Sequence, residues 1–146
     1  MMKAFNIDRE EDTIKLAERI SPFIKRGDII ALYGDLGTGK TFFTRYLCKA
    51  LGVKELVTSP SFVLINQYEA TEFKINHIDL FRLHNENDVL GLGIDDILED
   101  GVTVIEWPLL AELFFNERTI KVYFQYSLEG RSAIIESNKE FLADIS

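Results

Sequence analysis

The sequence predicts a single α/β domain in which helices flank a mixed central sheet and a β-hairpin lies near the C-terminus. Segments with the apolar pattern of strands alternate along the chain with segments of helical pattern, which is the arrangement of α/β proteins. The chain has 146 residues, of which 47% are hydrophobic, so its size and composition fit one domain with its own core. We therefore predict one domain over residues 1–146.

The first predicted element is a helix that begins after Asp8. Asp8 is a typical N-cap residue, and Glu11, three residues later, completes a capping box. Gly27 is expected to end the segment. Before it, apolar side chains recur at helical spacing, namely Ile14, Ala17, Ile20 and Ile24.

A buried strand and a second helix are predicted next. Residues 29–33 form a continuous apolar run, which is typical of a strand covered on both faces in a parallel sheet. The second helix is expected to start at Thr41 and to stop near Gly52. Its predicted apolar face consists of Phe43, Leu47 and Ala50.

The middle of the chain predicts a hairpin and a long polar connection. Residues 62–68 and 73–80 have the pattern of two strands joined by a short polar turn. Residues 82–100 are polar and interrupted by glycines, with at most a short helix near 95–98. Because this segment is too long for an ordinary connection, we expect it to form part of a docking surface.

The remaining residues predict one more buried strand and a final hairpin. The strand covers residues 102–107, and Pro108 is expected to open a short helix that extends to residue 115. The hairpin pairs residues 119–127 with 133–137 and turns at 129–131.

A glycine-rich segment between the first predicted strand and the second helix carries the strongest functional signal. Residues 34–41 read Gly-Asp-Leu-Gly-Thr-Gly-Lys-Thr, which matches the Walker A pattern at every fixed position. In this motif backbone N–H groups surround phosphate oxygens, the lysine reaches the β- and γ-phosphates, and the last hydroxyl binds Mg²⁺. The sequence therefore predicts binding of ATP or ADP with Mg²⁺ at Gly34, Asp35, Leu36, Gly37, Thr38, Gly39, Lys40, Thr41 and Phe42.

Two carboxylates follow buried strands, where a P-loop site needs an acid to organise the metal. Asp79 lies at the end of the strand predicted over 73–80, and Glu106 lies at the end of the next one. We predict that both act with Lys40 as catalytic residues and with Thr41 at the metal. An aspartate in this place typically holds the metal, while a glutamate on the next strand orients the attacking water. Which of the two contacts Mg²⁺ directly stays open.

Several other side chains allow two interpretations. Ser61 lies in the loop after the P-loop helix, where it either contacts the γ-phosphate or forms a plain turn. Trp107 either lies at the nucleotide or fills the core, and Arg82 either touches phosphate or forms a surface ion pair. His77 is expected to pack or to form a structural hydrogen bond, and Cys48 to be a small buried hydrophobe.

Composition disfavours several classes of function. A net charge of -8 repels phosphodiester backbones, so direct binding to nucleic acid is not expected. No apolar run approaches the roughly 20 residues that span a bilayer, and the acidic start resembles neither a secretory signal nor a transit peptide. The single cysteine suits a reducing compartment, so we expect a cytoplasmic protein. A guanine-specific Asn-Lys-x-Asp motif does not follow a later strand, which disfavours a GTPase.

Four segments occur in a compact order between residues 34 and 108. They are GDLGTGKT at 34–41, SPSF at 59–62, HIDLFRL at 77–83 and IEWP at 105–108. In this order they resemble the TsaE (YjeE) family of bacterial ATPases, which are needed to make threonylcarbamoyladenosine on tRNA. The resemblance covers about half the chain. It implies that Asp79 organises Mg²⁺, that Glu106 is the catalytic carboxylate and that Trp107 belongs to the nucleotide site.

The resemblance also implies partner proteins. These would be the TsaB- and TsaD-like proteins of the same pathway, with tRNA reached only through their complex. Independently of the resemblance, the chain leaves little length for a lid or a mobile arginine, so we expect ATP hydrolysis to be weak without a partner. Two alternatives remain open at this point. One is a small-molecule kinase, which shares the P-loop but needs an acceptor pocket and usually an arginine-rich lid. The other is a nucleotide-dependent binding module whose ATP turnover is incidental.

Overall fold

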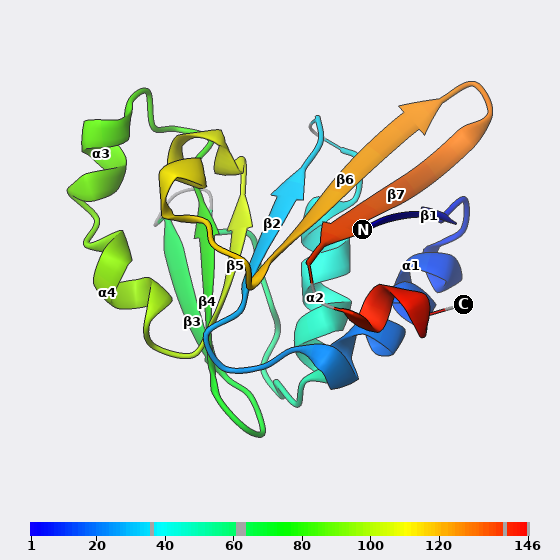
Figure 1. The fold of residues 1–146 in the computed structure, drawn as a ribbon, viewed down its shortest axis with the longest axis horizontal. Helices are drawn as coiled ribbons and strands as arrows, with labels where there is room; N and C mark the ends of the chain where they lie inside the picture. The colour runs from blue at the N-terminus through cyan, green and yellow to red at the C-terminus, as the bar shows by residue number, and fades with distance from the viewer. Residues whose placement is uncertain (36, 61–63, 139, 146) are drawn as a thin grey trace.

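Within residues 1–35, 37–60, 64–138 and 140–145, which the computed structural model describes, seven strands form one sheet (Figure 1). The strands are β1 (Met2–Asn6), β2 (Ile29–Tyr33), β3 (Ile65–Glu69), β4 (Lys74–Asp79), β5 (Val102–Glu106), β6 (Thr119–Ser127) and β7 (Gly130–Ser137). The helical segments are α1 (Glu10–Ile20), η1 (Ser21–Phe23), α2 (Lys40–Ala50), α3 (Glu86–Leu90), α4 (Ile94–Leu98), η2 (Pro108–Phe114) and η3 (Glu140–Ala143).

The sheet is mixed, as the sequence predicts. Its strand order is β1-β7-β6-β2-β5-β4-β3. Strand β2 runs parallel to both β5 and β6, and β5 runs parallel to β4. The outer pairs β1–β7, β6–β7 and β3–β4 are antiparallel, and the last two are the hairpins predicted from the sequence. Because β2, β5 and β4 are parallel neighbours, their carboxyl ends meet at one edge of the sheet.

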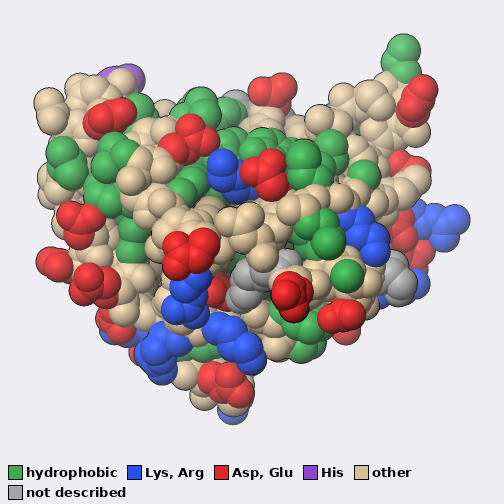
Figure 2. Space-filling model, in the orientation of Figure 1, with side chains coloured by type: hydrophobic (Ala, Val, Ile, Leu, Met, Phe, Trp, Pro, Cys, Tyr) green, Lys and Arg blue, Asp and Glu red, His purple; other side chains and the backbone are tan. Residues whose placement is uncertain are grey.

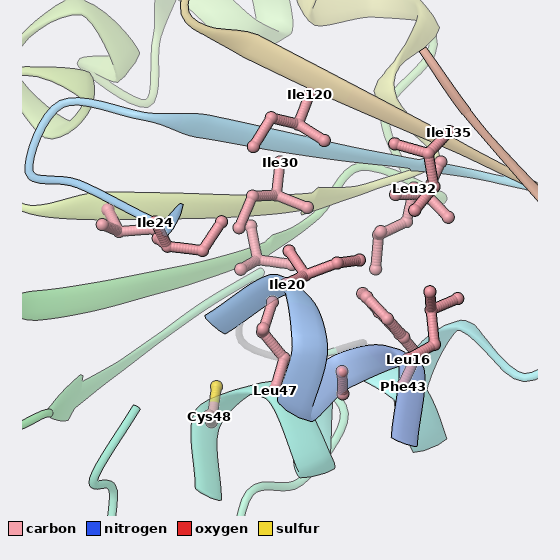
Figure 3. Packing of buried hydrophobic residues seen from close by; sticks show 14 of the residues in the cluster. Leu16, Ile20, Ile24, Ile30, Leu32, Phe43, Leu47, Cys48, Ile120 and Ile135 are labelled. Carbon is pink, nitrogen blue, oxygen red and sulfur yellow. The ribbon is translucent and has the colours of Figure 1, made fainter. Parts of the chain in front are cut away.

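Helices α1 and α2 pack on one face of the sheet (Figure 3). Side chains from both helices point toward β2, β6 and β7 in a continuous buried cluster. Cys48 lies in this cluster, as predicted, and burial raises the pKa of its thiol to about 12. The predicted apolar face of α2 is wrong at its last position: Ala50 is exposed, while Thr44 and Cys48 join Phe43 and Leu47 in the interior.

A second buried cluster lies on the other face, beneath α3, α4 and η2. Its members are Ile29, Ile78, Leu80, Val89, Ile94, Ile105 and Ala111. The two clusters together cover both faces of β2 and β5, which explains why almost every residue of these strands is buried.

On the face in Figure 2, acidic side chains are widely scattered, whereas a group of Lys and Arg side chains gathers toward the lower edge. Among the described residues, the structure contains no helix long and apolar enough to cross a membrane.

The N-terminus departs from the prediction in two ways. Strand β1, which the sequence did not reveal, pairs with β7. Helix α1 begins after Arg9 rather than after Asp8, and the Arg9 N–H donates to the Asp12 carboxylate at 3.0 Å. The carboxylate of Asp8 instead accepts a hydrogen bond of 2.7 Å from the Arg131 N–H at the start of β7. A distant partner has therefore displaced the local cap.

The polar segment 82–100 is more helical than predicted. Helix α4 corresponds to the short helix expected near 95–98, but α3 precedes it and was missed. The start of α3 carries a recognisable signal, because the Asn85 side chain accepts a hydrogen bond of 3.0 Å from the Asp88 N–H as an N-cap. With only five residues, α3 is too short to show a clear apolar period.

The C-terminal third differs from the prediction only in detail. The helix opened by Pro108 is a 3₁₀ helix that ends at Phe114. The last turn covers residues 128–129 rather than 129–131, so that β7 already starts at Gly130. At the tip of this hairpin Tyr126 is 69% exposed although its alternation with buried residues predicted burial, because the ribbon extends beyond the core.

Candidate functional site

The glycine-rich loop connects β2 to α2, as the motif requires. Gly37 and Gly39 have φ angles of 78° and 105°, which side chains other than glycine rarely adopt. A Cβ atom at either position would meet nothing within 4 Å, so these glycines serve the loop conformation rather than close packing. The N–H groups in the first turn of α2, including that of Phe42, have no intrahelical acceptor. The loop thus combines open space with a row of backbone donors.

Lys40 is the first residue of α2 and reaches back into this loop. It is only 5% exposed. Its Nζ atom donates to the carbonyl oxygens of Gly34 and Asp35, the latter at 3.2 Å. The same atom lies 3.8 Å from the centre of the Trp107 ring. Burial lowers the pKa of the Lys40 ammonium, and three nearby carboxylates oppose that shift, those of Glu106, Asp79 and Asp35.

The two predicted carboxylates lie side by side at the same edge of the sheet. Asp79 and Glu106 are direct register partners on the parallel strands β4 and β5, and they are 5% and 3% exposed. Leu32 of β2 is in turn the register partner of Glu106. Glu106 therefore lies on the strand next to the P-loop strand, while Asp79 lies one strand farther away.

The Thr41 hydroxyl joins the P-loop helix to this carboxylate pair. It donates to Glu106, with distances of 3.2 and 3.5 Å to Oε1 and Oε2. Asp79 accepts a hydrogen bond of 2.9 Å at Oδ1 from the Phe81 N–H. The structure thus brings together Lys40, Thr41, Asp79 and Glu106, which the sequence placed in one site from separate segments.

His77 contributes a contact that the sequence could not specify. Its Nε2 atom lies 2.6 Å from Glu106 Oε2, and both side chains are buried. This is the structural hydrogen bond that was one of the two expectations for His77. His77 lies two residues before Asp79 and therefore on the same face of β4, and Asp79 is the register partner of Glu106. In the sequence, the His-x-Asp spacing at a strand end was the one signal that placed His77 on the face of the carboxylates.

Trp107 lies at the loop rather than in the core. It adopts φ 56° and ψ 58°, a left-handed conformation that is rare for a large side chain. Its ring contacts the Phe81 ring, with 4.9 Å between the centroids, as well as the Lys40 ammonium. Such strained conformations concentrate at functional sites. The geometry places Trp107 beside the glycine-rich loop, through its contact with Lys40.

This placement predicts a fluorescence signal. Trp107 is the only tryptophan of the chain, and a phosphate that draws Lys40 away from the ring changes its surroundings. We expect a saturable change in tryptophan emission on addition of ATP or ADP. A flat signal, with binding established by calorimetry, would return Trp107 to a packing role.

The remaining candidates are distributed around this centre. The Thr38 hydroxyl donates to the Asp35 carbonyl at 2.7 Å and so closes the loop. The ring of Phe42 packs against Tyr46, so only its backbone faces the loop. Arg82 is exposed. Leu36 and Ser61 lie outside the described residues and stay predictions from the sequence.

The chemistry of the donor set fits a hydrated magnesium ion. A hydroxyl from Thr41 and carboxylates from Asp79 and Glu106 are oxygen ligands, which Mg²⁺ prefers. The described residues include no group of three or more His, Cys, Asp or Glu side chains that would hold a metal. In a P-loop site phosphates and water supply the other metal ligands.

Comparison with known proteins identifies the family. A family model described as threonylcarbamoyl adenosine biosynthesis protein TsaE matches residues 7–133. Two relatives carry the name tRNA threonylcarbamoyladenosine biosynthesis protein TsaE. The one from Aquifex aeolicus is 39% identical over 135 residues, which cover 84% of this chain and 97% of the relative. The one from Rickettsia felis is 34% identical over 142 residues, which cover 94% and 83%.

A solved structure has the same fold. The crystal structure of Bacillus subtilis YdiB superposes with a TM-score of 0.80 at 24% identity, covering 99% of this chain and 91% of YdiB. These matches include both the glycine-rich loop and the two strands that carry the carboxylates. The chain belongs to the TsaE family.

Proposed function

We propose that this chain is a Mg²⁺-dependent ATPase that acts in the biosynthesis of threonylcarbamoyladenosine on tRNA. The observation that carries the proposal is the meeting of three segments at one sheet edge. The Lys40–Thr41 start of α2 faces the register pair Asp79 and Glu106, with Thr41 in hydrogen-bond contact with Glu106. P-loop ATPases use such a set for phosphate binding, metal binding and activation of water.

The loop and Lys40 would bind the phosphates. A Cβ at Gly37 or Gly39 would meet nothing within 4 Å, so the N–H groups of these glycines and of the first turn of α2 are placed to donate to phosphate oxygens. Lys40 now donates to carbonyl oxygens of Gly34 and Asp35. A phosphate oxygen is a stronger acceptor than a carbonyl, so the ammonium is expected to exchange these contacts for the β- and γ-phosphates.

Thr41 and Asp79 would hold the magnesium ion, and Glu106 would orient the attacking water. When bound, Mg²⁺ neutralises the charge that develops on the phosphates. The Thr41 hydroxyl, which now donates a hydrogen bond to Glu106, would give up that contact when it turns toward the metal. The Glu106 carboxylate, kept at the strand end, then has lone pairs for a water molecule. ATP in place of GTP is supported by the missing guanine-specific motif.

The pathway follows from the relatives. The proteins from Aquifex aeolicus and Rickettsia felis are both named for tRNA threonylcarbamoyladenosine biosynthesis. We propose the same pathway for this chain, with TsaB- and TsaD-like proteins as its partners. The net charge of -8 supports contact with tRNA through those partners rather than directly.

Exposed apolar side chains on the segments that follow β4 and β5 support a protein partner. Phe81, which contacts Trp107, is 52% exposed. Leu109 and Leu113 on η2 are 68% and 54% exposed, and Leu90 on α3 is 51% exposed. The nearby helices α3 and α4 carry acidic residues in their first turns, so the partner surface should be apolar with basic residues around it. We call Phe81, Leu90, Leu109 and Leu113 the apolar surface.

Loss of this surface should weaken the complex. Replacing both Leu109 and Leu113 by serine is expected to reduce partner affinity by roughly tenfold or more, because buried apolar side chains dominate interface energies. The matched control is Leu128→Ser at the tip of the β6–β7 hairpin, where the leucine is fully exposed. Co-elution with the TsaB–TsaD complex is the measurement. Equal loss in both variants, or in neither, would contradict this docking surface.

Release of inorganic phosphate from Mg²⁺-ATP without an added acceptor tests the enzymatic proposal. We expect slow release by the chain alone and faster release with the partner proteins, because a partner can supply a charge that stabilises the transition state. Chelation of Mg²⁺ should abolish the release. Phosphate transfer only to an added small molecule would indicate a kinase. Binding of ATP without release under any of these conditions would indicate a binding module.

A further inference from the structure

We propose that His77 is a positioning residue that keeps the Glu106 carboxylate in place when Thr41 turns toward the metal. The inference deepens the proposed ATPase function and rests on it. It assigns a role to a buried side chain that belongs neither to the glycine-rich loop nor to the predicted catalytic set.

Burial of His77 is costly without a function. The side chain is fully buried on the face of β4 that also carries Ile75 of the first cluster. Its Nδ1 atom has no hydrogen-bond partner among the described residues. A buried polar atom without a partner destabilises a fold, and an aliphatic side chain would avoid this penalty. The polar contact that the imidazole does make is with Glu106.

Glu106 is held at both of its oxygens. Thr41 donates to it, with the shorter distance of 3.2 Å to Oε1, and His77 lies 2.6 Å from Oε2. The first anchor is temporary in the proposed reaction, because the Thr41 oxygen must turn toward Mg²⁺. The second anchor uses no group that a nucleotide or metal would take. Once Thr41 has turned away, His77 is the contact that still fixes the carboxylate.

The strand register makes this anchor rigid. His77 is opposite Val104, two residues before the register pair of Asp79 and Glu106. All three polar side chains therefore lie on the face of the sheet that packs against α2. Catalytic groups lose much of their effect when they are misplaced by about 1 Å, so a buried support on the neighbouring strand has a direct catalytic value.

Three variants test the role of His77. His77→Leu removes the donor, and His77→Gln keeps an amide N–H of similar reach. His84→Gln is the matched control, because His84 is the other of the two histidines and is exposed. We expect His77→Leu to lower kcat by roughly tenfold to a hundredfold, with ATP affinity changed by less than about threefold. His77→Gln should recover part of the loss, and His84→Gln should match the wild type.

Two further readouts separate positioning from a merely structural role. In the Glu106→Gln background His77→Leu should cause no additional loss of kcat, because the group that it positions is already inactive. In the protein without nucleotide, ¹⁵N NMR should show the imidazole resonances of both histidines. Glu106→Gln should shift the resonances of His77 and leave those of His84 unchanged. Both results would support the contact and its purpose.

The outcomes that contradict the inference are distinct from failure of the proposed function. A folded His77→Leu variant with wild-type kcat would overturn the positioning role alone. The positioning role would also be overturned if His77→Leu and His77→Gln lowered kcat equally and lost thermal stability to the same extent. A wild-type chain that releases no phosphate, even with its partners, would contradict the proposed ATPase function and the inference with it.

Discussion

Replacing Glu106 by glutamine is expected to reduce ATP turnover by roughly 10²–10⁴-fold, the usual effect of losing a positioned acid or base. Glutamine keeps the shape of the side chain but not its charge, so a water molecule would no longer be activated. The Thr41 hydroxyl can still donate to the amide oxygen. ATP affinity is therefore expected to change by less than about threefold. Single-turnover phosphate release and calorimetry measure the two quantities separately.

The control for this substitution is Glu99→Gln. Glu99 follows α4 and is exposed, so its change should leave turnover at the wild-type level. Because Thr41 contacts Glu106, the glutamate could also be the residue that binds the metal. If Glu106→Gln abolishes the Mg²⁺ dependence of ATP binding while Asp79→Asn loses only turnover, Glu106 holds the metal and Asp79 orients the water.

Replacing Lys40 by alanine is expected to weaken ATP binding by roughly tenfold to a hundredfold. Loss of a charge-assisted hydrogen bond to phosphate costs about 1.5–3 kcal/mol, which corresponds to that range of affinity. A lysine that follows a glycine-rich loop is expected to be exposed, but Lys40 is only 5% exposed. Its Nζ atom nevertheless contacts loop carbonyls and Trp107 rather than the apolar core. The fold should therefore persist.

Lys49→Ala is the matched control, because Lys49 lies on the same helix and is exposed. Thermal unfolding of both variants establishes that they are folded before affinity is measured. A folded Lys40→Ala protein that binds ATP as tightly as the wild type would contradict the assignment of the glycine-rich loop as the phosphate site.

The centre of the fold could be predicted because its signals are local. The apolar run of β2, the glycines of the loop and the amphipathic start of α2 are consecutive, and each restricts the chain by itself. The meeting of Asp79 and Glu106 was also predictable, since both end strands of a parallel arrangement and such ends share an edge.

The features that were missed depend on partners distant in sequence. Strand β1 alternates between exposed and partly buried residues, and its pairing partner β7 is more than a hundred residues away. Asp8 and Arg131 are also more than a hundred residues apart, and the hydrogen bond between them leaves α1 without Asp8 as its N-cap. The contact between His77 and Glu106 requires the register of β4 against β5, which depends on both strands together and not on the pattern of either one.

A crystal structure of the chain with Mg²⁺ and a non-hydrolysable ATP analogue tests the central proposal most directly. The account predicts that the β- and γ-phosphates lie against the loop of residues 34–41 and accept hydrogen bonds from Lys40. It also predicts that the metal contacts the Thr41 hydroxyl, with Asp79 and Glu106 beside it and the Trp107 ring moved from its place over Lys40. A nucleotide bound elsewhere, with Lys40 still donating to the Gly34 and Asp35 carbonyls, would contradict it.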